Sequence, residues 1–181
     1  MHNNFLEESA PRISRAVQLI RQNLRETLLW ASQKKRFIYY LEGNAMATMP
    51  NRTKDNPWRL KTPPGTSEYT MHTDEKDGKR ILVCTVGSTV LHYDARCIDD
   101  LHAMLKKAGD WVELGGADEQ KPVKDGTVEA WGRSETNPVG GWYGLKKGLR
   151  GRFGVYVPPL MEELGLCELE HNAKNNRIRA K

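Results

Sequence analysis

The sequence has few of the features that mark secreted, membrane-spanning or metal-binding proteins. Its 181 residues include only three cysteines, Cys84, Cys97 and Cys167, and no two of them form a C-x-x-C pair. No apolar run approaches the roughly 20 residues of a membrane span, and the N-terminus lacks the apolar stretch and cleavage site of a signal peptide. We therefore expect free thiols in a reducing cytoplasm, with no metal and no cofactor.

Common catalytic signatures are also missing. The chain has no Walker A lysine loop, no nucleotide-binding G-x-G-x-x-G, no G-x-S-x-G elbow and no H-E-x-x-H pair. His72 and His92, with Asp94 nearby, are the best enzyme-like group. Two strands apart in one sheet, at roughly 4.8 Å per strand, they would lie about 9–10 Å apart, too far for one zinc ion. We assign no catalytic residue, read Cys97 as a small buried side chain, and expect that the protein is not an enzyme.

Positive charge gathers in the C-terminal part of the chain. The net charge is +5, and no acidic residue lies between Pro138 and Val157, a stretch that contains the glycine- and aromatic-rich segment Gly140–Gly154. Glycines allow close approach of a ligand, cations neutralise phosphates and aromatic rings stack on bases. The residues that we assign to nucleic-acid or anion binding are Trp142, Tyr143, Lys146, Lys147, Arg150, Arg152, Arg177 and Arg179. The alternative is a turn-rich connection whose aromatic rings fill the core and whose cations are solvated.

Three strands are expected at 67–74, 79–86 and 89–94, after an extended segment anchored by Trp58 and Leu60. Asp77-Gly78 is a two-residue hairpin turn, and Gly87-Ser88 is a weaker one. Counting across both turns puts Val83 opposite His72 and His92. The alternation then places these residues on the other, core face: Tyr69, Met71, Leu82, Cys84, Val86, Leu91 and Tyr93.

The remaining elements complete an α+β fold. A helix over 95–108, capped by Asp94 and ended by Gly109, should cover the apolar sheet face. A short strand is expected at 111–114, and 127–134 fits either a helix capped by Thr127 or a strand. Pro158 and Pro159 should stop a helix from continuing from upstream, so a short helix is expected at 158–164. A hairpin of 166–170 and 177–180 ends this fold, an antiparallel β-meander packed on one amphipathic helix with a C-terminal short helix and β-hairpin.

The first 49 residues differ in composition from the rest. Apolar residues at helical spacing predict a basic amphipathic helix over 12–30. Such a helix can lie on a membrane surface, bind a partner, or pack on the domain or on a second copy to form a homo-oligomer. We expect residues 1–49 to be an N-terminal extension, which translation from an upstream start codon would explain, and residues 50–181 to be a single domain.

Two resemblances accompany these predictions. The blocks 61–71, 92–94, 140–154 and 156–160 resemble a family of small uncharacterised bacterial proteins over about residues 51–181. That resemblance implies a bacterial origin and a domain start near residue 50, and it supplies no site residues. Residues 160–166 and the hairpin after them resemble the helix and wing of winged-helix regulators. Pro158-Pro159 and the acidic Glu162 and Glu163 depart from that pattern.

Together these features favour a domain that binds an anionic partner, nucleic acid more than a small phosphorylated ligand. The contacts are expected from the segment 142–153 and from the terminal hairpin. The alternative is a protein-interaction module without catalysis, and the third hypothesis is a small-substrate enzyme that uses His72 and His92.

Overall fold

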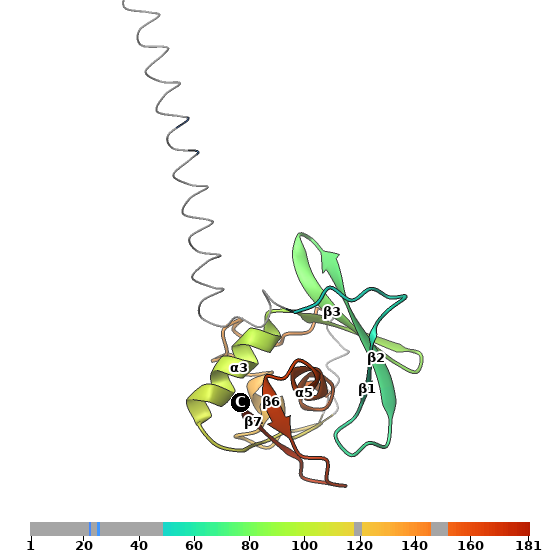
Figure 1. Cartoon of the computed structure of the whole chain (residues 1–181). Helices are drawn as coiled ribbons and strands as arrows, with labels where there is room; N and C mark the ends of the chain where they lie inside the picture. Colours follow the sequence, from blue (N-terminus) through green and yellow to red (C-terminus); the bar gives the residue numbers. More distant parts are fainter. Residues whose placement is uncertain (1–21, 23–24, 26–48, 118–120, 146–151) are drawn as a thin grey trace, which may run out of the picture. The chain divides into compact units, whose positions relative to one another are not determined.

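The computed structural model describes Gln22, Arg25 and residues 49–117, 121–145 and 152–181 (Figure 1). The chain divides into two units, Met1–Ala47 and Thr48–Lys181. In the first unit only Gln22 and Arg25 are described, and both are helical and exposed. The rest of the helix predicted over 12–30 lies outside the described residues. The upstream-start interpretation of residues 1–49 stays a prediction.

The second unit contains a four-stranded antiparallel meander. Its strands are β1 (Trp58–Lys61), β2 (Glu68–Lys76), β3 (Lys79–Val86) and β4 (Thr89–Asp94), in the spatial order β1-β2-β3-β4. Val83 pairs with His72 on one side and with His92 on the other, which confirms the register counted from the sequence. Asp77 and Gly78 have positive φ angles of 52° and 72°, as the predicted hairpin turn requires.

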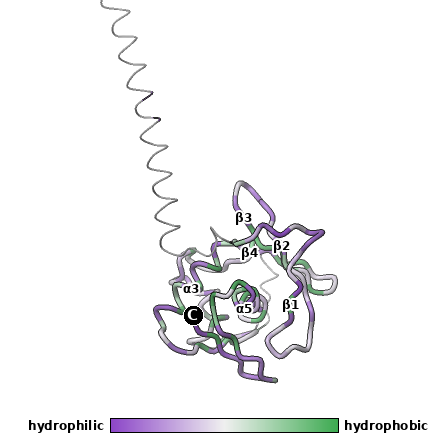
Figure 2. The backbone as a smooth tube through the Cα atoms, viewed as in Figure 1, coloured by the Kyte–Doolittle hydropathy of each residue, from purple (hydrophilic) through white to green (hydrophobic). Residues whose placement is uncertain are grey.

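One face of this sheet is the core face. Its buried side chains, as predicted, are Tyr69, Met71, Leu82, Cys84, Leu91 and Tyr93, and Val86 is half-buried. The segment around Trp58 and Leu60, expected only to be extended, is the added strand β1, because Trp58 pairs with Met71 and both residues face the core. Figure 2 shows hydrophobic residues along the middle of the sheet and along α5 (Phe153–Glu163), and hydrophilic residues at the outer turns.

Helix α3 (Cys97–Ala108) starts two residues later than predicted. Asp94 accepts a hydrogen bond from the backbone N–H of Arg96 at 3.0 Å, which forms the turn before the helix and does not cap it. The helix ends as predicted at Gly109, whose φ of 67° is left-handed. The α3 helix packs against β7 (Arg177–Ala180), whereas α5 packs against β1. In Figure 1, α5 lies between the meander and the layer that holds α3 and the second sheet.

Helix α5 corrects the prediction of a short helix at 158–164. It runs from Phe153 to Glu163, straight through Pro158 and Pro159. Each proline removes one backbone hydrogen bond, and a proline inside a helix usually costs about 3 kcal/mol. Both rings are buried, as are Val157 and Leu160 beside them. Burial of this apolar surface between two layers outweighs the local preference to begin a helix at Pro158.

A second sheet has the order β5-β7-β6, with β5 at Val112–Glu113 and β6 at Cys167–Leu169. The hairpin of β6 and β7 and the short strand β5 were predicted. The segment that fitted a helix or a strand is α4 (Val128–Trp131), and the Thr127 hydroxyl caps it by accepting from the backbone N–H of Ala130 at 3.1 Å. The α+β class is confirmed. Over the part of the chain that the structure describes, no helix is long and apolar enough to cross a bilayer.

Candidate functional site

The basic segment begins as an addition to the meander. The backbone N–H of Asp94 donates to the carbonyl of Tyr143 at 2.8 Å, and the N–H of Leu145 donates to the carbonyl of His92 at 3.0 Å. Between them Gly144 bridges Tyr93. The chain entering the run of cations is therefore fixed along the edge of β4.

The aromatic side chains of the segment belong to the core. The Tyr143 ring is 1% exposed and stacks on Trp131 and Phe153, with centroids at 5.4 and 5.6 Å. Its hydroxyl donates to Asp100 at 2.9 Å, and burial and this hydrogen bond raise the pKa of Tyr143. Half-buried Trp142 meets Phe153 edge-on at 6.1 Å. Trp131 and Phe153 also contact each other, with centroids at 6.2 Å, so Tyr143 belongs to a compact cluster of three rings, the arrangement expected when such aromatics fill a core.

Glycines in the segment serve this packing. A Cβ atom at Gly154 would meet the carbonyl oxygen of Leu114, and one at Gly144 would meet the indole nitrogen of Trp142. The N–H of Gly154 donates to the buried carboxylate of Glu129 at 2.7 Å. The close backbone approach expected for a ligand is, at these positions, an approach of the chain to itself.

A buried ion pair next to this cluster was not anticipated from the sequence. Glu129 is fully buried and contacts the Arg133 guanidinium at 2.5 Å, while Arg133 also donates to the carbonyl of Ala117 at 2.6 Å. Burial raises the pKa of Glu129, and the bonds from Gly154 and Arg133 act in the opposite direction. Through its bond to Gly154, the Glu129 carboxylate joins α4 to the start of α5. The only signal in the sequence is the spacing of four between an acid and an arginine, which is common on exposed helices.

The predicted cations have different surroundings. Lys146, Lys147 and Arg150 lie outside the described residues, and Arg152 is exposed at the start of α5 with a φ of 45°. On the hairpin, Arg177 pairs with Glu170 and Arg179 with Glu168, each at 2.6 Å. Both guanidinium groups also lie over the ring of Trp111, at 5.4 and 4.8 Å. The charges of the hairpin arginines are therefore opposed by carboxylates on the facing strand or just beyond it.

The residues weighed for catalysis are spread out. His72 and His92 are half-buried on the face of the meander opposite the core, one on each side of Val83. Cys97 is fully buried, and burial followed by the nearby Asp94 raises the pKa of its thiol, which disfavours a reactive thiolate. The described residues contain no group of three His, Cys, Asp or Glu side chains placed to hold a metal ion.

The order of α5 and the β6–β7 hairpin follows the helix-and-wing order of winged-helix regulators. The helix itself is buried from Val157 to Met161, so it does not present a face that could enter a major groove. That local resemblance and the bacterial origin stay predictions.

Comparison with known proteins gives one match. No curated protein and no solved structure matches the chain. A family model matches residues 50–181, which is nearly the range of the family resemblance seen in the sequence. Through these residues the chain belongs to the family of unknown function DUF6855.

Proposed function

We propose that the chain binds a phosphate-bearing polyanion, nucleic acid foremost, through Lys146, Lys147, Arg150 and Arg152. The observation that carries this proposal is the anchoring of the segment at both ends. Leu145 is hydrogen-bonded to β4, and Phe153 is fully buried at the start of α5. Four cations thus lie within seven residues between two fixed points, and no acid lies near them in the sequence.

Phosphate contact fits this arrangement better than base stacking. Cations neutralise phosphates without regard to sequence. The start of α5 is buried and its Gly154 N–H donates to Glu129, so we expect the phosphate contacts to come from the cations. The Tyr143 ring is buried and cannot stack on a base, so we expect duplex and single-stranded ligands to bind with similar affinity. The hairpin arginines should contribute little, because Glu168 and Glu170 oppose their charges.

The first prediction tests these cations. Replacing all four by glutamine should abolish binding to a labelled DNA duplex and to a single-stranded RNA at about 50 mM salt, measured by fluorescence anisotropy. For the parent chain, log affinity should fall with log salt with a slope of about −2 to −4, because each phosphate contact contributes about −0.7 to −0.9.

A matched control removes the same charge elsewhere. Four exposed lysines serve for this control: Lys76, Lys79, Lys106 and Lys107. Their replacement by glutamine should leave most of the affinity intact.

Trp142→Ala should lower the thermal midpoint and leave the affinity nearly unchanged, because the ring packs on Phe153. If both fourfold variants lost the same amount of affinity, net charge alone would explain the binding, and the proposal would be contradicted. If the parent chain binds neither ligand, the nucleic-acid proposal is wrong and a protein-interaction module becomes the leading function. The apolar side chains of Val90 and Leu145, each 40% exposed, favour that second candidate.

A further inference from the structure

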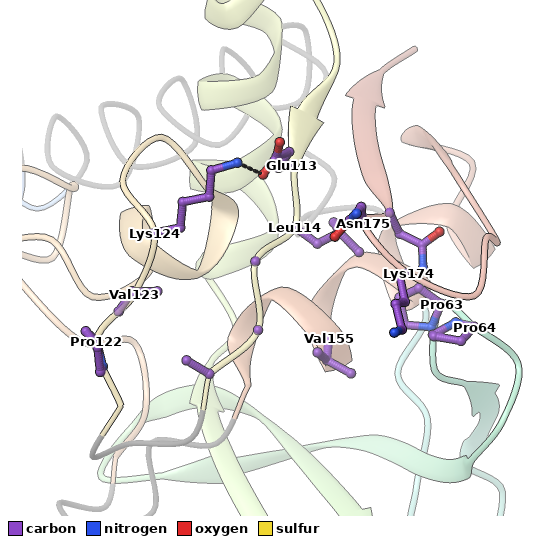
Figure 3. Close-up of a pocket in the computed structure, with 14 residues that line it drawn as sticks. Pro63, Pro64, Glu113, Leu114, Pro122, Val123, Lys124, Val155, Lys174 and Asn175 are labelled. Carbon is purple, nitrogen blue, oxygen red and sulfur yellow. Dashed lines mark hydrogen bonds and ion pairs between the residues drawn. The ribbon is translucent and has the colours of Figure 1, made fainter.

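A cavity of about 630 Å³ lies beside the β1–β2 connection, where distant parts of the chain meet (Figure 3). Its volume is within the range of about 300–1,000 Å³ that is usual for small-molecule sites. One side carries Glu113 and Lys124, joined by an ion pair, and the opposite side carries Lys174 and Pro63. Val155 of α5 lies between the two sides.

Hydrogen bonds hold the walls of this cavity in place. The carbonyl of Asn176 accepts from the backbone N–H of Leu114 at 2.9 Å, and the Thr127 hydroxyl donates to the carbonyl of Lys124 at 2.8 Å. The Asn176 side chain donates to the carbonyl of Asn172 at 2.8 Å, which closes the turn that carries Lys174. On the Pro63 side, the Pro63 carbonyl lies 3.0 Å from Nδ1 of His171. The site is therefore largely preformed, and ligand binding would cost little entropy for ordering the walls.

The charges around the cavity indicate the ligand. The carboxylate of Glu113 neutralises Lys124 at 2.5 Å. Lys174, in contrast, has no hydrogen bond or ion pair to any residue that the structure describes. The apolar surface comes from prolines, valines and one leucine: Pro63, Pro64, Pro122, Val123, Val155 and Leu114. One unopposed cation beside an apolar surface matches a ligand with a single negative charge and an apolar body.

We propose that this cavity binds a small organic carboxylate with an aromatic or branched apolar body, with the carboxylate at Lys174 and the body against the proline and valine side chains. Because Glu113 already pairs with Lys124, the second negative charge of a phosphate ester would find no further unpaired cation among the described residues here, which favours a carboxylate. The site shares no cation with the segment 146–152, so it is independent of polyanion binding.

The test uses the full chain labelled with ¹⁵N and two probes of the same shape. 2-Naphthoate carries the negative charge, and 2-naphthamide is its neutral counterpart. Titration with naphthoate should shift the backbone amide signals of Gly115, Gly116, Val155 and Lys174 and should saturate. Lys174→Gln should weaken naphthoate binding about fivefold, which is the scale of one exposed ion pair, and should leave naphthamide binding unchanged.

Two controls separate this site from general effects. Lys107→Gln removes an exposed lysine at the end of α3 and should change neither titration. The fourfold glutamine variant at 146–152 should keep its naphthoate affinity, whether or not the parent chain binds nucleic acid. Signal shifts away from the cavity only, titration without saturation, or equal naphthoate affinity in Lys174→Gln would each overturn the proposal.

Discussion

Gly154 is the residue at which local preference and tertiary contact disagree most clearly. Inside a helix, alanine is favoured over glycine by about 1 kcal/mol. At this position, however, a Cβ atom would run into the Leu114 carbonyl oxygen and lie 3.3 Å from the Glu129 nitrogen. Both obstacles are backbone atoms that hydrogen bonds hold in place.

Gly154→Ala should therefore lower the free energy of unfolding by about 1–3 kcal/mol, the usual cost of overpacking, although it improves helix propensity. Denaturant unfolding measures the change. Ala103→Gly, at an exposed position of α3, calibrates propensity alone and should cost about 1 kcal/mol. A Gly154→Ala chain more stable than the parent would show that α5 does not approach Leu114 this closely.

Among the elements, α5, the hairpin and the β1–β2 connection meet at His171. Its Nε2 lies 3.0 Å from the Glu162 carboxylate, and its Nδ1 lies 3.0 Å from the Pro63 carbonyl. Since both partners accept, only the doubly protonated imidazolium can donate to both. The hydrogen bond to Glu162 is the main reason that the pKa of His171 is raised, and burial opposes it.

This pairing predicts a pH-dependent contribution to stability. The folded-state pKa of His171 is raised, so its contribution is complete below the unfolded-state pKa of about 6.5 and is lost as the pH rises through the folded-state value. His171→Gln should reduce the free energy of unfolding by less than about 1 kcal/mol at pH 5.5, since the ion pair is exposed, and by less still at pH 8.5. If the loss of unfolding free energy in His171→Gln were larger at pH 8.5 than at pH 5.5, this assignment would be wrong.

At the scale of the whole molecule, we propose that residues 49–181 fold independently. The family match begins at residue 50. Met49 is 5% exposed, and its carbonyl accepts from Arg80 at 3.0 Å, so the domain needs this residue as well.

A chain of residues 49–181 should keep the thermal midpoint of the full chain within a few degrees, measured by calorimetry. A fall of about 10 °C or more, worth over 1 kcal/mol for a domain of this size, would show that the first 48 residues stabilise the domain. A chain of residues 51–181 provides the matched comparison. It should lower the midpoint further, because it removes Met49 and the carbonyl that Arg80 contacts.

The sequence by itself determined three of the four strands of the meander, their register and the end of α3. Those features depend on short-range chemistry: Asp77-Gly78 permits the left-handed turn, alternation sets the faces of the strands, and Gly109 ends the helix. It also raised the possibility that the aromatic rings fill the core, without choosing between core and ligand. Only the tertiary structure decided that Tyr143 stacks on Trp131 and Phe153. The tertiary structure also decided the length of α5 and the burial of Glu129 with Arg133. It decided as well that Arg177 and Arg179 pair with carboxylates. Each depends on packing or charge contacts made when the chain folds, and neither spacing nor composition encodes which of the available partners a side chain will meet.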